Sequence, residues 1–335
     1  MKYVVVGLWA IGSLIGGLLS KSDEDVVLIG KEKQVRILNE KGLKINGFKN
    51  PIFVENINVS TDLSLIKNAD IIFVCVKSQD TKNLAENIKK HLSKNSIIIS
   101  FQNGVRNAQI IKEITLVKTL SSIIFFNAVY FKPGEVELTM DQGLIIENDE
   151  TCSDKLKTVV EILNKEKLKA ELVDEIDGFL WSKLIINLQN SVTSLTGQTI
   201  KESIIDKDSR KILIAVMKEG LEVLKQTEIV VKTLPDIDPE KLIRRMSMLN
   251  STMLKIGSKI MNIKKNARSS MLQSISRGKP TEIDYINGEI VSLAKKNNLN
   301  APVNAKIVEL VKKMEKKQFE RDFKPSELRK ILKVG

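Results

Sequence analysis

The first thirty residues constrain the fold of this chain more than any other stretch. Lys2–Val6 is a short run of β-branched apolar residues, the pattern of a buried strand. A glycine-bearing turn over residues 7–13 leads into an apolar helix through Leu19, and residues 26–29 form a second strand. A strand, a glycine turn, a helix and a strand within about thirty residues is the unit that holds a dinucleotide pyrophosphate on a helix N-terminus. We therefore predict a nucleotide cofactor at this turn.

Trp9 is the one residue that argues against this prediction. It stands where the second glycine of G-x-G-x-x-G lets the backbone approach a phosphate. Two outcomes are open: the ring turns outward and the turn survives, or the ring occupies phosphate space and weakens binding. We expect the site to persist with reduced affinity, and assign cofactor binding to Gly7, Leu8, Trp9, Ala10, Ile11 and Gly12.

Length and composition predict a soluble cytoplasmic protein of two domains. The 335 residues suffice for two cores, and no apolar run approaches the roughly 20 residues that span a bilayer. The chain starts with a strand, so we expect no secretory signal. Cys75 and Cys152 suggest no disulfide framework, and a single histidine, His91, makes a metal site unexpected.

The formal net charge of +12 raises the question of nucleic acid. The lysines are spread among glutamates on expected helix faces, and aromatic residues make up only 4% of the chain, which leaves little for base stacking. We therefore expect no nucleic-acid partner and no membrane, but a small anionic substrate. We also expect a homodimer formed through the helical domain.

The first half of the chain predicts a parallel, doubly wound sheet. Buried-strand runs at 70–76 and 96–100 alternate with helical stretches at 31–41 and 81–91. Two short strand-like segments, at 43–45 and 52–54, follow the helical stretch at 31–41. Two or three antiparallel strands over 123–131 and 134–147, joined by a turn at 132–134, complete this half.

From Cys152 onward the pattern predicts nearly continuous helix. The fold class is thus α/β, an N-terminal Rossmann-type doubly wound sheet followed by an all-helical C-terminal domain. We place a nucleotide-binding domain at 1–170 and a helical substrate and catalytic domain at 171–335. Apolar spacing of i, i+3, i+4 predicts helices over 152–165, 176–196, 206–226, 239–262, 281–297 and 302–317.

Three polar residues follow predicted strands of the first domain. Lys77 and Asn103 come after the strands at 70–76 and 96–100, where ligands lie in open α/β sheets. Each alone is as well explained as a loop residue, but two on one rim favour a site. Lys31 stands where an NAD enzyme usually has an acid for the ribose 2′-hydroxyl. A cation at a helix start costs about a few tenths of a kcal/mol, and a bound 2′-phosphate would reverse the sign of this effect. This favours NADP over NAD, with an ordinary solvated lysine as the alternative.

The helix expected over 176–196 carries a polar stripe through an otherwise apolar surface. Lys183, Asn187 and Asn190 recur at i, i+4 and i+7. Burying a lysine and two amides is costly unless they have partners. A packed polar network would satisfy them, but a site in which the stripe binds substrate is the favoured interpretation.

The segment 268–288 holds the remaining candidates. Thr281 and Asp284 predict a capping box for the helix over 281–297, which explains both as structural residues. The capping box gives no structural reason for Glu282 or for the paired serines Ser269 and Ser270.

Together these motifs resemble the ketopantoate reductase family nearly from end to end. The resemblance rests on the stretches 7–13, 76–77, 102–104, 181–187, 269–273 and 281–288. It implies NADPH-dependent reduction of 2-dehydropantoate to pantoate, on the route to pantothenate and coenzyme A. It further implies that Lys183 is the general acid, that Asn103, Asn187, Ser270 and Glu282 hold substrate with Glu282 also near the cofactor, and that Gly7, Gly12, Lys31 and Lys77 serve NADPH.

Some positions depart from the family pattern. Besides Trp9, Ser274 stands where the family usually has aspartate, Ser191 lies near a position often held by asparagine, and the stretch 225–266 is longer than in short members. Two alternatives therefore stay open: a related reductase of another 2-keto acid, and a Rossmann-derived binding protein with weakened cofactor affinity.

Overall fold

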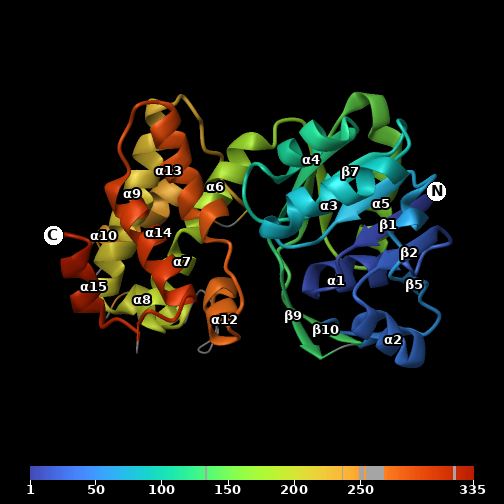
Figure 1. The fold of residues 1–335 in the computed structure, drawn as a ribbon, viewed down its shortest axis with the longest axis horizontal. Coiled ribbons are helices and arrows are strands. Elements are labelled where there is room, and N and C mark those ends of the chain that lie inside the picture. Colours follow the sequence, from blue (N-terminus) through green and yellow to red (C-terminus); the bar gives the residue numbers. More distant parts are fainter. Residues whose placement is uncertain (133, 236, 249–252, 254–267, 320–321) are drawn as a thin grey trace. The chain divides into compact units, whose positions relative to one another are not determined.

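The computed structural model describes residues 1–132, 134–235, 237–248, 253, 268–319 and 322–335. The chain divides into two compact units, Met1–Ile176 and Asp177–Gly335 (Figure 1). The boundary predicted at residue 170 is therefore six residues too early. It would cut a strand, β12 (Ala170–Val173), that belongs to the sheet of the first unit.

The first unit is built on an eight-stranded sheet in the order β12-β11-β8-β7-β6-β1-β2-β5. Six neighbouring strands are parallel: β1 (Lys2–Val6), β2 (Asp25–Ile29), β5 (Val59–Ser60), β6 (Ile71–Val74), β7 (Ile97–Ser100) and β8 (Lys118–Ile124). The chain runs outward from β1 through β2 and β5, then returns to build β6, β7 and β8 on the other side. This is the Rossmann order, and its direction reverses between β1 and β6.

Apolar side chains cover both faces of this sheet. Tyr3 and Val5 of β1 join one core cluster, and Val4 and Val6 join the other, as the two-residue period of a strand requires. The first cluster includes side chains of α1 (Ala10–Leu19) and α5 (Ser153–Lys165), and the second includes side chains of α3 (Thr81–Ile88) and α4 (Asn107–Thr115). Burial on both faces explains why the strands are almost entirely apolar.

A second, four-stranded sheet packs on α1. Its order is β4-β3-β10-β9, with β3 (Leu43–Asn46), β4 (Ile52–Val54), β9 (Asn127–Lys132) and β10 (Glu135–Met140). One face of this sheet packs into the core cluster that also contains the buried side chains of α1. The sheet contributes Leu43, Ile45, Val136 and Leu138 to this cluster. Helix α2 (Glu32–Lys41) precedes β3 and lies beside the β9–β10 hairpin (Figure 1).

The alternation of strands and helices was predicted correctly for this unit, but four elements were misjudged. Helix α4 and the short strand β5 were not predicted. The strand expected at 123–131 is divided, since β8 ends at Ile124 and β9 begins at Asn127. Strand β11 (Leu144–Glu147) pairs antiparallel with β8, and β12 then pairs parallel with β11, so the chain is not all helix after Cys152.

The described residues of the second unit form helices and connecting segments, with no strand among them. Helix α9 (Lys207–Gln226) lies against α6, α7, α13 and α14, and buries Ile212, Leu213, Val216 and Met217 (Figure 1). No helix in the described part of the chain is long and apolar enough to cross a membrane. The helices are α6 (Asp177–Asn187), α7 (Gln189–Thr196), α8 (Ile200–Ile205), α9, α10 (Pro239–Met248), α12 (Ser270–Ser276), α13 (Asn287–Lys296), α14 (Pro302–Glu315) and α15 (Pro325–Ile331).

Two predicted helices of this unit differ from the structure. The helix expected over 176–196 is divided at Leu188, because α6 ends at Asn187 and α7 starts at Gln189. The helix expected over 281–297 starts only at Asn287, as α13. Of the helix predicted over 239–262, α10 is present, and residues 249–252 and 254–262 lie outside the described residues.

Candidate functional site

Two glycines shape the turn between β1 and α1. Gly7 has a φ of 103°, which favours glycine, and its N–H donates to the Ile29 carbonyl at 2.9 Å. A Cβ on Gly12 would lie 2.0 Å from the Gly7 carbonyl oxygen. Any residue other than glycine at position 12 would therefore clash, and glycine lets the first turn of α1 approach the end of β1 closely. Both glycines thus have a structural reason, and they bring the N-terminus of α1 directly onto the carboxyl end of β1.

The N-terminus of α1 fits an anionic group. Trp9 is the N-cap, no side chain caps the helix there, and its first turn holds no acidic residue. Ala10 and Ile11 follow as its first residues. The amide groups of such a turn and the helix dipole favour a phosphate. The residues present therefore fit the pyrophosphate of a dinucleotide.

The Trp9 ring is directed toward a neighbouring strand. Its backbone has an ordinary φ of −85°, so no glycine is needed at this position for conformation. The indole makes an edge-on contact with Tyr130 of β9, with ring centroids 5.5 Å apart, and remains 37% exposed. The turn keeps its form with the indole in place.

Lys31 lies at the junction of β2 and α2. It is the N-cap of α2 and is exposed, as a lysine that meets a ligand phosphate must be. Its main-chain N–H donates to Gln34 Oε1 at 3.1 Å. The location matches the position at which Rossmann-type domains distinguish a ribose 2′-hydroxyl from a 2′-phosphate.

A buried hydrogen-bond network joins the segments that carry Lys77 and Asn103. Ser78 Oγ donates to the Asn103 carbonyl at 2.9 Å, and Asn107 Nδ2 donates to the same carbonyl at 2.6 Å. Thr81 Oγ1 donates to Asn107 Oδ1 at 2.9 Å and accepts from Gln102 Nε2 at 2.7 Å. Both candidates lie half-buried at the same edge of the sheet, which confirms the shared rim.

Sequence reasoning did not assign roles to Ser78, Thr81, Gln102 and Asn107. These four side chains are buried, and buried polar groups need partners. Their clustering just after two apolar strands was the available signal. The network ties together the two segments that carry Lys77 and Asn103.

Helix α6 carries Lys183 and is fixed by the residue next to it. Ser182 is fully buried, and its Oγ lies 2.8 Å from the Gly178 carbonyl and 2.5 Å from the Lys232 carbonyl. Lys232 N–H also donates to Gly178 at 3.2 Å. The first turns of α6 are thereby attached to the segment after α9.

Lys183 is half-buried, and burial lowers the pKa of its ammonium group to about 8. Glu282 acts in the opposite direction, because its carboxylate raises the pKa of Lys183. The structure therefore brings Lys183 and Glu282 together within the second unit. Desolvation is the larger of the two effects, which answers a question that the sequence left open.

The polar stripe predicted on one helix is interrupted. Leu188 keeps helical dihedral angles (φ −56°, ψ −27°), but Ser191 Oγ donates to its carbonyl at 2.8 Å and a new helix begins. Asn187 is half-buried at the end of α6, whereas Asn190 is buried in the first turn of α7. Asn187 therefore shares α6 with Lys183, one turn further along, whereas Asn190 belongs to the next helix.

The paired serines have different roles. Ser269 is buried and caps α12, accepting from the Leu272 N–H at 3.2 Å, and its hydroxyl lies 2.8 Å from Thr193 Oγ1. This gives Ser269 the structural role that the sequence did not reveal. Ser270 is exposed at the start of α12 and is accessible to a ligand.

The predicted capping box at Thr281 and Asp284 is wrong. Thr281 Oγ1 accepts from the Ile283 N–H at 3.2 Å, and the Thr281 N–H donates to Glu315 of α14 at 2.7 Å. Asp284 forms a 2.6 Å ion pair with Lys312, also on α14. The segment before α13 is therefore held by α14, and Glu282 lies in this segment as the N-cap of a short 3₁₀ helix, Ile283–Tyr285.

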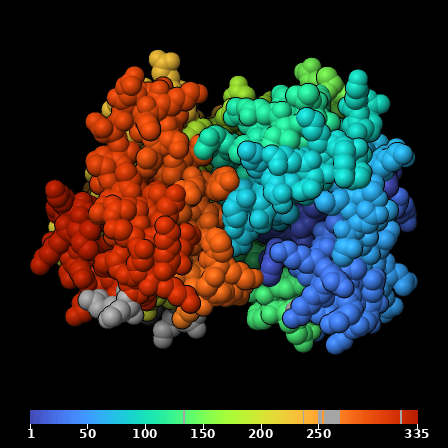
Figure 2. Space-filling model, in the orientation of Figure 1, coloured from blue at the N-terminus to red at the C-terminus, as the bar shows by residue number. Residues whose placement is uncertain are grey.

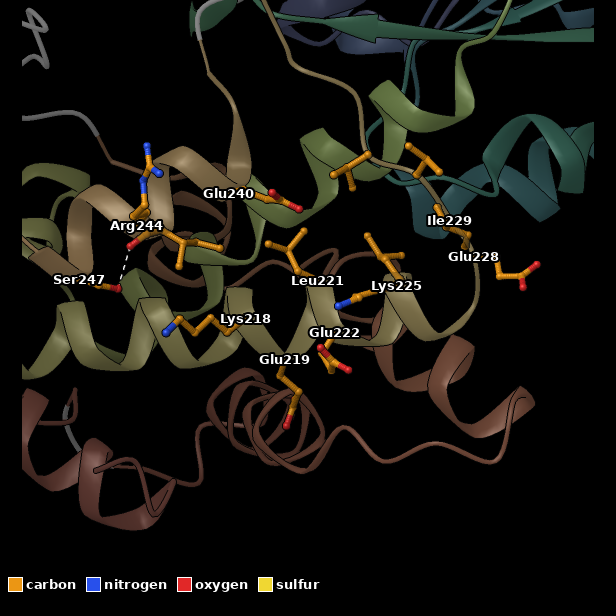
Figure 3. A pocket seen from close by; sticks show the side chains of 14 residues that line it. Lys218, Glu219, Leu221, Glu222, Lys225, Glu228, Ile229, Glu240, Arg244 and Ser247 are labelled. Carbon is orange, nitrogen blue, oxygen red and sulfur yellow. Dashed lines mark hydrogen bonds between the residues drawn. The ribbon is translucent and has the colours of Figure 1, made fainter.

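A groove of about 1070 Å³ lies elsewhere in the second unit (Figure 3). Apolar side chains of α9 and of residues 229–231 line it, together with acidic and basic side chains of α9 and α10. Among the described residues that line it, none belongs to the predicted site. Its wall includes Lys218, Leu221, Lys225, Ile229, Glu240 and Arg244.

The fold and these groups define a class of protein: a Rossmann-type nucleotide-binding unit followed by a helical unit with a lysine–carboxylate pair. Two family models match the chain, "Ketopantoate reductase PanE/ApbA" over residues 3–150 and "Ketopantoate reductase PanE/ApbA C terminal" over residues 175–315. The chain belongs to the ketopantoate reductase family.

Relatives of known name agree with this assignment. A 2-dehydropantoate 2-reductase of Pyrococcus horikoshii is 33% identical over 318 residues, covering 94% of this chain and 98% of that protein. One of Pyrococcus abyssi is also 33% identical, over 93% and 97% of the two chains.

Solved structures agree in fold. A PanE/ApbA family ketopantoate reductase from Ralstonia eutropha superimposes with a TM-score of 0.82 at 26% identity, covering 95% of this chain and 99% of that one. D-mandelate dehydrogenase with NADH and anilino(oxo)acetate gives a TM-score of 0.80 at 22% identity, with the same coverage, and shows likeness of fold alone.

Proposed function

We propose that this protein is an NADPH-dependent 2-dehydropantoate 2-reductase that acts in the formation of pantothenate and coenzyme A. The observation that carries the proposal is the Lys183–Glu282 pair, a lysine with a pKa of about 8 beside a carboxylate. The relatives of 33% identity over nearly the whole chain carry the name of this activity.

Lys183 is the proposed proton donor. Reduction of a ketone builds negative charge on its oxygen, and a nearby ammonium group both stabilises this charge and supplies the proton. A pKa of about 8 keeps Lys183 mostly protonated at neutral pH yet ready to release the proton. The carboxylate of Glu282 maintains that protonated state.

The remaining polar residues are proposed to hold the substrate. Amide and hydroxyl groups donate hydrogen bonds to a carboxylate and orient the keto group. We assign this role to Asn103, Asn187, Asn190 and Ser270. Asn190 is the most buried of these, and its carbonyl is held by Ser194 Oγ at 2.6 Å.

NADPH is the proposed cofactor, and it supplies the hydride when bound. The glycine turn and the N-terminus of α1 are the proposed pyrophosphate site. Lys31, which is exposed at the start of α2, is assigned to the 2′-phosphate, and Lys77 contributes a second cation. We further propose Asn103 and Glu282 as residues near the cofactor, and expect a homodimer, measurable by sedimentation.

Steady-state oxidation of NADPH tests the proposal. Ketopantoate is compared with a panel of other 2-keto acids, and NADPH with NADH, under one set of conditions. We expect the highest kcat/KM with ketopantoate and NADPH. Preference for another keto acid would identify a related reductase instead, and failure to bind either nucleotide by calorimetry would make the chain a binding protein without this activity.

A further inference from the structure

Gln34 is a buried side chain in the first turn of α2 for which the sequence suggests no function. Only 8% of the residue is exposed, although glutamine is usually at the surface. Its amide makes hydrogen bonds to three segments of the first unit that are far apart in sequence. A buried amide with this many partners is highly constrained.

The nitrogen of this amide reaches the glycine turn. Gln34 Nε2 donates to the Leu8 carbonyl at 2.5 Å, across 26 residues of sequence. Ser13 Oγ donates to the same carbonyl at 3.2 Å from within α1. The peptide group between Leu8 and Trp9 is therefore fixed from two sides, at the residue before the N-terminus of α1.

The oxygen of the same amide reaches the start of α2. Gln34 Oε1 accepts from the Lys31 N–H at 3.1 Å. A carbonyl can only accept and a main-chain N–H can only donate, so the two partners fix which end of the amide faces which segment. Glutamate would lose the donor toward Leu8, and an apolar residue would lose both bonds.

A third contact attaches the β9 strand. The hydroxyl of Tyr130 is hydrogen-bonded to the Gln34 side chain, and the Tyr130 ring contacts Trp9. The surfaces of α2 and of the β9–β10 hairpin lie side by side, in blue and green (Figures 1 and 2). Gln34 therefore sits beneath the junction of the glycine turn, α2 and the hairpin.

Helix capping alone does not account for this arrangement. A residue at the third position of a helix caps by accepting from the N-cap N–H, which uses only Oε1. The Nε2 bond to Leu8, the bond to Tyr130 and the burial of the side chain are additional. They connect the two places that the proposed function assigns to the pyrophosphate and to the 2′-phosphate.

We infer that Gln34 is a positioning residue of the cofactor site, which fixes the spacing between the pyrophosphate turn at Leu8 and the 2′-phosphate lysine, Lys31. This inference rests on the proposed function, because it assumes that a dinucleotide occupies the turn. A dinucleotide phosphorylated at the ribose must meet both places at once. The Gln34 amide fixes the distance between the Leu8 turn and Lys31 before the ligand binds, so the ligand does not have to impose it.

The test compares dissociation constants of NADPH and NADH by calorimetry for the wild type and three variants. Gln34→Met keeps the size of the side chain and removes every hydrogen bond, and we expect NADPH to bind at least tenfold more weakly. The loss with NADH should be smaller, so the preference for NADPH falls. Tyr130→Phe removes one of the three contacts and should have a smaller effect of the same kind.

Asn164→Leu is the matched control. Asn164 is also an amide that bridges two main-chain groups of this unit, donating to the Ala170 carbonyl at 2.9 Å and accepting from its N–H at 3.0 Å. It joins α5 to β12, away from the glycine turn. We expect Asn164→Leu to lower Tm and to leave both dissociation constants unchanged.

The outcomes separate the two proposals. A wild type that binds neither nucleotide contradicts the proposed function. The positioning role is overturned if the wild type binds NADPH and Gln34→Met lowers only Tm, leaving the dissociation constants of NADPH and NADH unchanged. Gln34→Asn, shorter by one methylene, replaces Gln34→Met where the latter does not fold, and unchanged constants in that variant overturn the inference equally.

Discussion

Ser78 Oγ donates a 2.9 Å hydrogen bond to the main-chain carbonyl of Asn103, and thereby joins the segment after β6 to the segment after β7. Lys77 directly precedes Ser78. This hydrogen bond therefore links the backbone next to Lys77, a proposed cofactor residue, to the backbone of Asn103, a proposed substrate residue. The buried side chain of Asn107 donates both to that carbonyl and to Ser78 Oγ, at 2.6 Å and 3.2 Å. The rim is therefore one hydrogen-bonded unit and not two independent loops.

Asn107→Ala is expected to disturb this rim. The substitution leaves the buried Thr81 hydroxyl and the Asn103 carbonyl with fewer partners, which costs about 1–3 kcal/mol of the free energy of unfolding. We also expect KM for the keto acid to rise, since Asn103 loses its support. Urea denaturation and steady-state kinetics measure the two effects.

Asn87→Ala is the control for this prediction. Asn87 is exposed on α3, and its amide bonds only locally, to the Asn83 carbonyl at 2.7 Å and to Asn83 Oδ1 at 3.2 Å. Its loss should change stability by less than about 0.5 kcal/mol. Equal effects of the two alanines would show that the buried network does not support the rim.

The sequence predicted the sheet of the first unit well, because each strand is buried on both faces. Such strands are apolar runs between helices, and β1, β2, β6 and β7 stand out for this reason. Strand β5 was missed because it has only two residues, Val59 and Ser60, and pairs with only part of β2. Strand β12 was missed because it is an edge strand of mixed polarity at the end of the sheet.

Lys183→Ala is expected to lower kcat about a hundredfold or more, because the reaction loses a positioned proton donor. The dissociation constant of NADPH should change little, since the lysine is assigned to the substrate. Steady-state kinetics and calorimetry provide the two measurements. A kcat within about threefold of the wild type would remove Lys183 from the mechanism.

The pH dependence of the reaction should report the Lys183–Glu282 pair. The acid form of Lys183 is the active one, so kcat/KM is expected to fall as pH rises through about 8. Glu282→Gln removes the negative charge that raises the pKa of Lys183, so the fall should begin at lower pH. KM for the keto acid should rise as well.

Asp284→Asn controls for a general loss of negative charge. Asp284 lies two residues from Glu282, but it forms its ion pair with Lys312, and its side chain is 58% exposed. Its removal should leave the pH midpoint in place. If Glu282→Gln instead lowered Tm with an unchanged pH profile, Glu282 would be a structural residue.

The sequence identified the chemistry of the second unit better than its geometry. Lys183 was recognisable as a lysine within an apolar helix, and such a residue needs a reason. The break at Leu188 was not recognisable, because Leu188 keeps helical dihedral angles and the sequence around it has no proline or glycine. The capping box failed for another reason: Thr281 and Asp284 are held by α14, which follows them by some twenty residues or more.

Trp9 provides the last prediction. Its backbone is already in an ordinary conformation, and its ring lies against Tyr130 instead of being packed in the core. Glycine at this position removes the bulk of the indole beside the N-terminus of α1, where the main chain is expected to approach the pyrophosphate. We expect Trp9→Gly to tighten NADPH binding at least about tenfold, on the order of 1.4 kcal/mol.

Trp9→Phe separates the effect of bulk from the effect of the ring contact, because it retains an aromatic ring that can meet Tyr130. Dissociation constants for the three proteins are measured at one salt concentration, since phosphate binding depends on ionic strength. Equal constants would mean that the indole stays clear of the cofactor. Weaker binding by Trp9→Gly, with Trp9→Phe close to the wild type, would mean that an aromatic ring at this position contributes to cofactor binding, and that this chain uses such a ring where its family uses a glycine.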